Sequence, residues 1–330
     1  MSDRYTRREF VGTIAQAAGA VAVATTVAAQ AYTTDRSLPQ RRLGRTGAQV
    51  SVLGLGMGPL GIADYSAAET HTVVRAALDE WGGPVYVDVQ PDYGEAERYL
   101  APVIRERRED VFIVTKTWEQ NRAGALASVQ ESVRRLEVEY VDAVLLNNIG
   151  FFDLEQLFTR DGALAGLRDA QAAGLVRYVG LSGHMGRDRF VAALDSGEFD
   201  IAMPAINFVD RHTYDFEGII LPLAATHDVG VAAMKVLGGA VDWDYSTRAQ
   251  RALLLGDDYE PAIRYALGLP EVATAVIGCK SVDEVRHAAN AARGYRPLSE
   301  DEQDRLLERG KQLAAQWGPH FGPVEVATQG

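Results

Sequence analysis

Eight short apolar runs recur along the chain after residue 50, and segments in which apolar residues repeat with helical spacing lie between them. The runs show little alternation of polar and apolar residues, which is typical of parallel strands buried on both faces. They lie at 51–58, 85–90, 111–117, 141–148, 178–184, 201–207, 229–238 and 274–280. Eight such units predict an α/β fold in which a parallel sheet closes into a (β/α)8 TIM barrel.

A doubly wound open sheet is the alternative fold for this alternation. It calls for a Gly-x-Gly-x-x-Gly turn that opens a helix after an early strand. The glycines of "GLGMGPLG" (54–61) lie within and just after the first strand instead, which favours the barrel. Before that strand, "RRLGRTGAQVS" (41–51) places Gly-Arg-Thr-Gly between two extended pieces, a pattern that predicts an N-terminal β-hairpin.

The first residues have the pattern of an export signal. Arg7 and Arg8 form a twin-arginine pair, an uncharged Ala- and Val-rich run follows at 11–31, and "AQA" (29–31) offers small residues for a signal peptidase. We expect a signal peptide at 1–31, a linker at 32–40 and the barrel at 41–330. The partner would be the twin-arginine export machinery, and the mature protein would lie in the periplasm or outside the cell. Membrane attachment is expected only if the signal stays uncleaved.

The overall charge narrows the classes of partner. The formal net charge is −12, which argues against binding nucleic acid or an anionic membrane surface. Cys279 is the single cysteine, so the chain can form no internal disulfide. The six histidines are scattered without the spacing of metal ligands, so we expect no metal site.

Polar residues gather where the predicted strands end, which is where reactive residues of such barrels lie. Asp88 and Tyr93 follow the second strand, and Lys116 ends the third. A buried ammonium next to a phenol favours the phenolate, and a carboxylate keeps the ammonium charged and in place. The three residues could therefore make the phenol an acid/base group with an adjusted pKa. Alternatively, Asp88 and Lys116 could be a structural ion pair beside an ordinary aromatic residue.

Six segments in order resemble the aldo-keto reductase superfamily: "RRLGRTGAQVSVLGLGMG", "VDVQPDYGEAE", "VFIVTKT", "VDAVLLNNIG", "YVGLSGH" and "AVIGCKSVDEV". The resemblance implies a barrel that binds NADP(H), with NAD(H) as the other nicotinamide cofactor it allows. It further implies hydride transfer between that cofactor and the carbon of a carbonyl or alcohol. On this reading Tyr93 is the acid/base, Lys116 lowers the pKa of its phenol, and Asp88 positions Lys116.

The same resemblance suggests a cofactor site on later strands. Lys280 could pair with a 2′-phosphate, and Ser281 and Glu284 have the spacing of a capping box that starts a helix. A capped helix next to a solvated lysine is the alternative. "KVLGG" resembles a loop facing the pyrophosphate, and it contains Lys235, Gly238 and Gly239.

Two positions depart from the family pattern. Asn147 stands where the usual catalytic residue is His, and an amide donates a hydrogen bond but carries no proton. Ser182 is followed by Gly183, where many members have Ser-Asn against the nicotinamide carboxamide. Asn207, from the next strand, could supply that missing amide.

The substrate side is predicted from residues in strand-end loops. Trp118 and Trp243 belong to a set of loop aromatic residues that could form a substrate wall or could pack only on one another. Asn148 either begins a loop or contacts substrate, and His184 either faces the site or caps backbone groups.

The main functional hypothesis is an NADP(H)-dependent oxidoreductase of the aldo-keto reductase type. The first alternative is a nicotinamide-binding sensor or scaffold with little turnover, because Asn147 replaces the usual His. A lyase or isomerase that forms a Schiff base on Lys116 is the third hypothesis.

Overall fold

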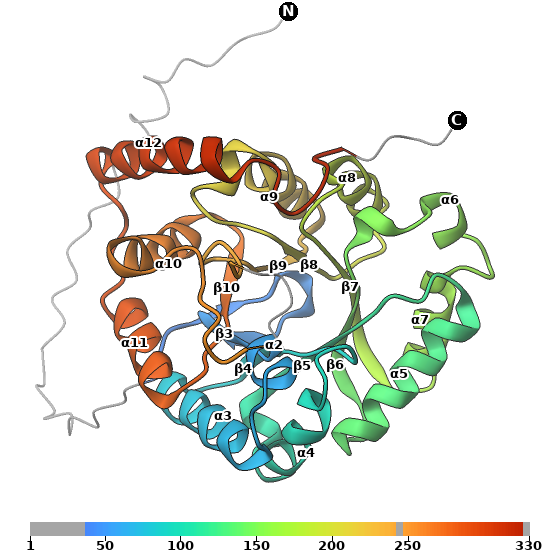
Figure 1. Cartoon of the computed structure of the whole chain (residues 1–330). Coiled ribbons are helices and arrows are strands. Elements are labelled where there is room, and N and C mark those ends of the chain that lie inside the picture. Colours follow the sequence, from blue (N-terminus) through green and yellow to red (C-terminus); the bar gives the residue numbers. More distant parts are fainter. Residues whose placement is uncertain (1–36, 242–246, 326–330) are drawn as a thin grey trace, which may run out of the picture. The chain divides into compact units, whose positions relative to one another are not determined.

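Eight parallel strands close into a barrel in the computed structural model, which describes residues 37–241 and 247–325. Their order around the barrel is β10-β3-β4-β5-β6-β7-β8-β9. The strands are β3 (Leu53–Gly56), β4 (Val85–Asp88), β5 (Val111–Thr117), β6 (Val141–Leu146), β7 (Val176–Gly183), β8 (Ile201–Pro204), β9 (Gly230–Ala233) and β10 (Val272–Ile277). Figure 1 shows helices surrounding this barrel, so the predicted fold class is confirmed.

Most of the strands end earlier than the apolar runs predict. β8 stops at Pro204 and β9 stops at Ala233, whereas the runs continue to residues 207 and 238. Ala205, Ile206 and Val236 remain buried beyond these ends, and Ala205 still forms an isolated bridge with Met234. Apolar character therefore continues into the strand-end loops, and hydrophobicity alone does not locate the last paired residue.

Serine residues cap two of the longer helices. Ser66 caps α3 (Ala67–Trp81) and Ser299 caps α12 (Glu300–Trp317), each in a complete capping box. The remaining helices are α2 (Gly58–Ile62), α4 (Ala96–Glu106), α5 (Arg122–Leu136), α6 (Leu154–Leu157), α7 (Ala163–Ala172), α8 (Arg187–Asp195), α9 (Phe216–His227), α10 (Tyr259–Gly268) and α11 (Val282–Arg293). Short 3-10 turns lie at η1 (Gly44–Thr46), η2 (Arg108–Asp110), η3 (Ile149–Phe151), η4 (Asp210–His212) and η5 (Gly256–Asp258).

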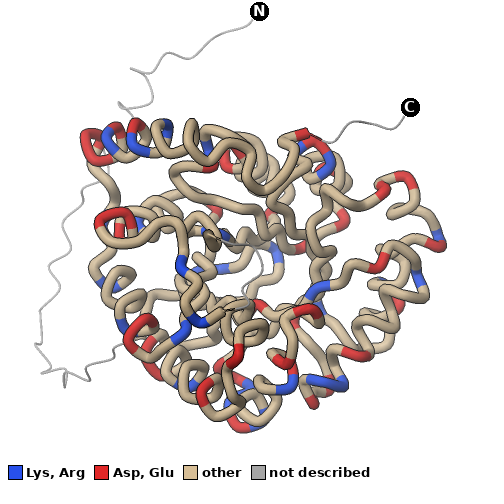
Figure 2. The backbone as a smooth tube through the Cα atoms, in the orientation of Figure 1, with Lys and Arg blue, Asp and Glu red and all other residues tan. Residues whose placement is uncertain are grey.

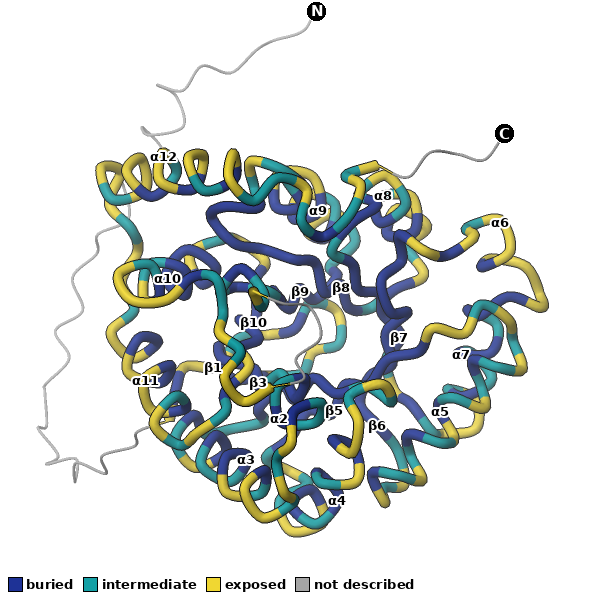
Figure 3. Tube along the Cα trace, in the orientation of Figure 1, coloured by how far each residue is buried: buried dark blue, intermediate teal, exposed yellow. Residues whose placement is uncertain are grey.

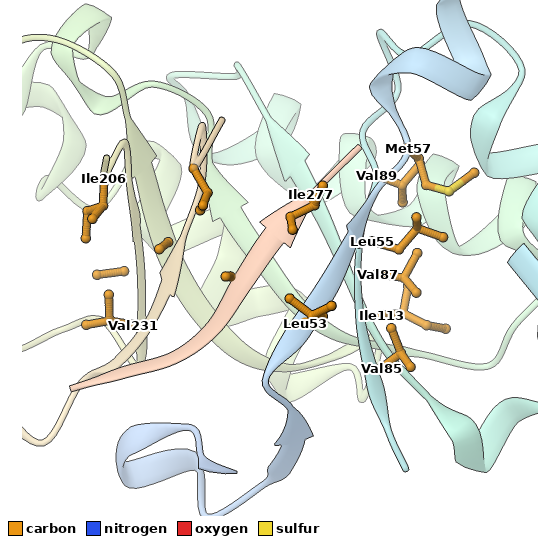
Figure 4. Packing of buried hydrophobic residues seen from close by; sticks show 14 of the residues in the cluster. Leu53, Leu55, Met57, Val85, Val87, Val89, Ile113, Ile206, Val231 and Ile277 are labelled. Carbon is orange, nitrogen blue, oxygen red and sulfur yellow. The ribbon is translucent and has the colours of Figure 1, made fainter. Parts of the chain in front are cut away.

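The apolar core has two layers separated by the barrel wall. Outward-facing strand residues such as Leu53, Val87 and Ile113 pack under the helices, as Figure 4 shows from close by. Inward-facing residues such as Tyr86 and Leu145 fill the barrel. Figure 3 shows the strands buried and the outer helical faces exposed, and Figure 2 shows acidic and basic residues on those helices. The barrel is a packed core, so reactive chemistry is confined to its mouth.

The predicted hairpin is present at the start of the folded chain. β1 (Gln40–Arg42) pairs antiparallel with β2 (Gln49–Ser51), and Gly47 takes a left-handed conformation between them. Arg45 N donates to the carbonyl of Asp228, just before β9, and Leu43 is fully buried. The hairpin therefore closes the end of the barrel where the strands begin.

The predicted export signal at 1–31 and residues 32–36 of the linker lie outside the described residues. The rest of the linker is already folded, because Leu38 N bonds to Trp81 O and Gln40 begins β1. The folded body thus starts slightly before the predicted residue 41. Within residues 37–241 and 247–325, no helix is long and apolar enough to cross a membrane.

Candidate active site

A cavity at the mouth of the barrel gathers most of the predicted reactive residues. Its lining includes Asp88, Tyr93, Lys116, Asn147, His184, Lys235, Gly239 and Lys280. These residues come from the ends of β4, β5, β6, β7, β9 and β10, or from the loops that follow them. The carboxyl ends of neighbouring parallel strands meet at one end of the barrel, which is why residues distant in sequence share this cavity.

The register of β4 and β5 brings Asp88 and Lys116 together. Asp88 lies opposite Val114, an inward-facing residue, and Lys116 is two residues further along the same face of β5. The Lys116 ammonium donates a hydrogen bond to Asp88 Oδ1. Lys116 is 3% exposed and Asp88 is 4% exposed, so this is a buried ion pair.

Tyr93 lies directly beside this ion pair. It follows β4 in a turn where its backbone N–H donates to Gln90 O at 3.0 Å. Its ring centre is 5.3 Å from Lys116 Nζ. Gly58 lies next to the phenol, since a Cβ added there would make a van der Waals contact of 3.5 Å with Tyr93 Cζ. The predicted trio of Asp88, Lys116 and Tyr93 is therefore assembled at one place.

The surrounding charges explain how Asp88 is held. Burial raises the pKa of the Asp88 carboxyl, while the Lys116 ammonium and then the Lys235 ammonium act in the opposite direction. Two lysines thus act electrostatically on one buried carboxylate. The excess positive charge favours anionic groups at the mouth of the barrel, including a phenolate.

Asn147, the residue predicted to replace the family's usual histidine, lies at the end of β6. It is 5% exposed and lines the cavity. Its Nδ2 donates to Gln90 Oε1 at 2.6 Å, and its Oδ1 faces Ser182 Oγ at 3.4 Å. Its backbone N–H donates to Thr117 O at 2.8 Å. Contacts from β4, β5 and β7 therefore fix this amide.

Asn148 and His184 form the adjoining part of the mouth. Asn148 has φ of 56°, its backbone N–H donates to Ser182 Oγ, and its Oδ1 accepts from His184 N. Asn148 does not line the cavity, so its main visible role is the turn after β6. The His184 ring does line it, and burial lowers the pKa of that imidazole well below 6.5. His184 is therefore neutral near pH 7.

The two side chains predicted to hold the nicotinamide carboxamide have partners inside the protein. Ser182 Oγ lies 3.2 Å from Leu146 O and accepts from Asn148 N. Asn207 Nδ2 donates to Asp210 and to Lys235 O, while its Oδ1 accepts from two backbone amides. Neither residue lines the cavity, and Asn207 has no unused hydrogen-bonding capacity.

Of the three residues predicted to face phosphates in the loop after β9, two line the cavity and one does not. Lys235 has φ of 56° and lines the cavity together with Gly239. Gly238, at φ 80°, packs instead against Trp317. A Cβ added at Gly238 would lie only 2.7 Å from that ring, so the packing requires a glycine. Gly238 thus allows close packing of α12, whereas Gly239 faces the cavity.

The start of α11 has the predicted cap in a modified form. Ser281 Oγ accepts from Glu284 N, but the Glu284 carboxylate accepts from Lys280 N rather than from Ser281 N. Lys280 Nζ donates to Arg248 O and Gln250 O, in the loop that follows β9. Lys280 lines the cavity, while Ser281 and Glu284 support the helix start.

Two residues of that loop were not predicted from the sequence. Arg248 makes a bidentate pair with Glu69, donates to Asp64 O and lies over the Tyr65 ring. Gln250 lines the cavity, and its side-chain N and O are buried without a hydrogen-bond partner. Such an amide calls for a polar ligand. In sequence, both residues are ordinary loop residues with no distinguishing pattern.

Of the two tryptophans predicted for the aromatic substrate wall, only Trp118 lies within the described residues. Trp118 is 43% exposed and lies 5.9 Å from Phe151, outside the cavity lining. Trp243 lies outside the described residues. Phe321, from the segment after α12, packs 5.5 Å from His184 and so reaches the edge of the mouth.

A closed parallel barrel with an ion-paired lysine beside a tyrosine at its mouth is an arrangement suited to acid/base chemistry. Comparison with known proteins also indicates an enzyme. Residues 52–251 match the model of the aldo/keto reductase family, and the chain belongs to this family. The predicted enzyme class, an oxidoreductase of the aldo-keto reductase type, is thereby confirmed.

Individual relatives are distant. The chain is 24% identical to L-galactose dehydrogenase of Arabidopsis thaliana, over 85% of this chain and 98% of that protein. It is 25% identical to pyridoxal 4-dehydrogenase of Microbacterium luteolum, over 75% and 91%. A solved aldo-keto reductase structure from Pseudomonas aeruginosa has TM-score 0.63 and 28% identity, covering 77% of this chain and 95% of its own. The structure of a Klebsiella pneumoniae aldo-keto reductase in complex with NADP and acetate has TM-score 0.65, 21% identity and coverage of 82% and 95%.

Proposed function

We propose that this protein is an NADP(H)-dependent oxidoreductase that interconverts a carbonyl compound and an alcohol, with Tyr93 as the acid/base. The observation that carries the proposal is the buried Asp88–Lys116 ion pair with the Tyr93 ring 5.3 Å from Lys116 Nζ. An ion pair buried only for stability has no need of a cavity-lining phenol beside it. Both charged residues and the phenol line the same cavity.

In the reduction, the cofactor supplies the hydride, and the side chains of this chain supply the proton and position the substrate. When bound, the reduced nicotinamide supplies the hydride that the carbonyl carbon receives. The Tyr93 hydroxyl gives its proton to the carbonyl oxygen, and the Lys116 ammonium stabilises the phenolate that remains. Asp88 keeps Lys116 in position. Asn147 donates a hydrogen bond to the same oxygen, so it orients the substrate without exchanging a proton.

The cavity has groups suited to a nicotinamide dinucleotide. The orphaned amide of Gln250 can bond to polar atoms of the cofactor, and the backbone at Gly239 allows close approach of phosphates. Lys235 and Lys280 supply positive charge on the same side. The Klebsiella pneumoniae structure that shares this fold holds NADP, which supports NADP(H) over NAD(H) as the first cofactor to test.

Single-turnover oxidation of bound NADPH tests the proposal. The panel should include aldoses and aromatic aldehydes, because the relatives are dehydrogenases of L-galactose and of pyridoxal. Wild-type protein should oxidise NADPH with at least one compound, and Tyr93→Phe should lose this by at least about a hundredfold. Tight NADPH binding with no oxidation beyond that of Tyr93→Phe would instead support the sensor or scaffold hypothesis.

Borohydride trapping distinguishes the Schiff-base hypothesis from the oxidoreductase hypothesis and from the sensor or scaffold hypothesis. A covalent adduct on Lys116 that needs substrate and no cofactor would favour a lyase or isomerase. We expect no adduct, since Lys116 is held in a buried ion pair with Asp88 and its nitrogen is not free to attack a carbonyl.

We further propose that residues 1–31 direct export of the folded protein through the twin-arginine machinery. The support is the Arg7–Arg8 pair ahead of the uncharged run at 11–31. Lysine at both positions should keep the protein in the cytoplasm, whereas wild type should appear in the periplasmic fraction. Equal periplasmic amounts of the two forms would contradict this route.

A further inference from the structure

Gln90 contacts both groups that would meet the reacting oxygen. Its side-chain Oε1 accepts from Asn147 Nδ2 at 2.6 Å, and its backbone O accepts from Tyr93 N at 3.0 Å. It lies two residues after Asp88, in the turn that leaves β4. Gln90 does not itself line the cavity, so any effect it has on substrate must pass through a neighbour.

We propose that Gln90 is a positioning residue that orients the Asn147 amide toward the oxygen that Tyr93 protonates; this inference rests on the proposed function. The Asn147 Nδ2 carries two N–H donors, and Gln90 accepts one of them. The other N–H is left for a ligand in the cavity that Asn147 lines.

The contacts around Asn147 support a single orientation of its amide. With Nδ2 toward Gln90, the Oδ1 faces Ser182 Oγ at 3.4 Å, and the single Ser182 hydroxyl proton is shared between this oxygen and Leu146 O at 3.2 Å. The opposite orientation would place two carbonyl oxygens against each other unless the Gln90 amide also turned. A short bond to Gln90 and a long one to Ser182 assign the main orienting role to Gln90.

The backbone contact gives Gln90 a second role in the geometry. Because its carbonyl holds the Tyr93 N–H, one residue sets the position of the Tyr93 turn and the direction of the Asn147 amide. The two donors are thus fixed relative to each other across β4 and β6. Small errors in such placement reduce the rate of the chemical step strongly.

Gln90→Leu removes the side-chain acceptor, keeps the approximate size and leaves the backbone carbonyl in place. We expect kcat for carbonyl reduction to fall about tenfold, with little change in NADPH affinity. In an Asn147→Ala background the same substitution should cost less than about twofold, because the amide it orients is gone. Gln90→Met repeats the test with a second apolar side chain should the leucine variant fold poorly.

Gln171→Leu is a matched control. Gln171 is a half-buried amide on α7 that bonds to Arg177 O, away from the cavity, so its substitution should leave kcat within twofold. Equal losses for Gln90→Leu with and without Asn147, or no loss with Asn147 present, would overturn the proposal.

A readout without turnover separates this inference from the proposed function. In protein with nitrogen-labelled asparagine, the signal absent from Asn147→Ala identifies the Asn147 side-chain amide. Its hydrogen-bonded proton should move upfield in Gln90→Leu and stay in place in Gln171→Leu. An unmoved signal contradicts the role of Gln90 even if no carbonyl is reduced, whereas a moved signal with an inactive wild type overturns only the proposed function.

Discussion

At Asn147, the residue predicted to replace the family's usual histidine, the surroundings suit a donor that never titrates. Gln90 accepts its N–H at 2.6 Å, and no carboxylate among the described residues hydrogen-bonds to the side chain. An amide cannot hold a proton, so the pH dependence of reduction should follow Tyr93 with no separate contribution from residue 147.

Asn147→His should therefore raise carbonyl reduction. An imidazole can donate one N–H to Gln90 or to the reacting oxygen, and it can also become positive in the transition state. We expect kcat to rise by about tenfold, less than the full effect of a general acid because Tyr93 already supplies the proton. The check is kcat across pH beside Asn147→Gln, which gains no titratable group. A complete loss of activity would show that the site is shaped for the amide.

The sequence predicted the reactive trio but not its supporting residues, for a physical reason. Asp88, Tyr93 and Lys116 stand out because charged and phenolic groups at the ends of buried strands need an explanation. Gln90 and Gln250 become distinctive only through contacts across strands and loops, which depend on register and loop path. Likewise, nothing in the sequence reveals that local bonds consume the amide of Asn207.

The start of α9 contains a buried acid with a predictable effect on stability. Glu217 is 7% exposed and bonds to the Tyr265 hydroxyl and to Arg211. Burial raises the pKa of its carboxyl from 4.5 to about 7, and these two partners only partly oppose the shift. The folded state therefore binds a proton that the unfolded state releases between those two values.

The sign of the pH effect follows from this difference. The stability that Glu217 contributes is fully present below pH 4.5 and is lost as the pH rises through about 7. The loss amounts to about 3 kcal/mol from one group. Glu217→Gln should remove this part of the decline. Urea midpoints of both proteins between pH 5 and 8 provide the measurement, and parallel declines would contradict the assignment.

Arg248 attaches the loop after β9 to the start of α3, which follows β3, two strands further around the barrel. Its guanidinium pairs with Glu69 and lies 4.2 Å from the centre of the Tyr65 ring, while Lys280 bonds to the loop carbonyls. The loop therefore crosses the side of the cavity where Gln250 offers its unpaired amide.

Arg248→Ala should speed cofactor release. The Arg248–Glu69 pair is about half exposed, so we expect only a modest increase in the NADPH dissociation rate, up to about fivefold. Added salt should raise the wild-type rate toward that of the variant, because screening weakens exposed pairs. Stopped-flow displacement of NADPH measures both rates. Arg286→Ala, which breaks a pair with Glu80 on α3, is a control that should leave the dissociation rate unchanged.

The barrel was predictable because the pattern of an apolar run followed by a helical segment repeats eight times. An error in the bounds of one strand does not change the predicted number of strands. The apolar runs located every strand, although several end early because buried residues continue into the mouth. Sequence could not reveal how the other end of the barrel is closed. That closure depends on the close approach of the hairpin turn to β9, which is a tertiary contact.

Gly44 should therefore matter to the stability of the entire barrel. It has φ of 49°, and a Cβ there would lie 2.1 Å from Gly230 N at the start of β9. Gly44→Ala would force the hairpin away from the barrel, and we expect a loss of about 3 kcal/mol or more, or failure to fold. Gly47, at φ 69°, has no atom within 4 Å of an added Cβ. Gly47→Ala should cost only the left-handed strain, about 1 kcal/mol. Denaturant unfolding of the two variants compares close approach with strain alone, and equal losses would mean that the hairpin turn does not seal the barrel.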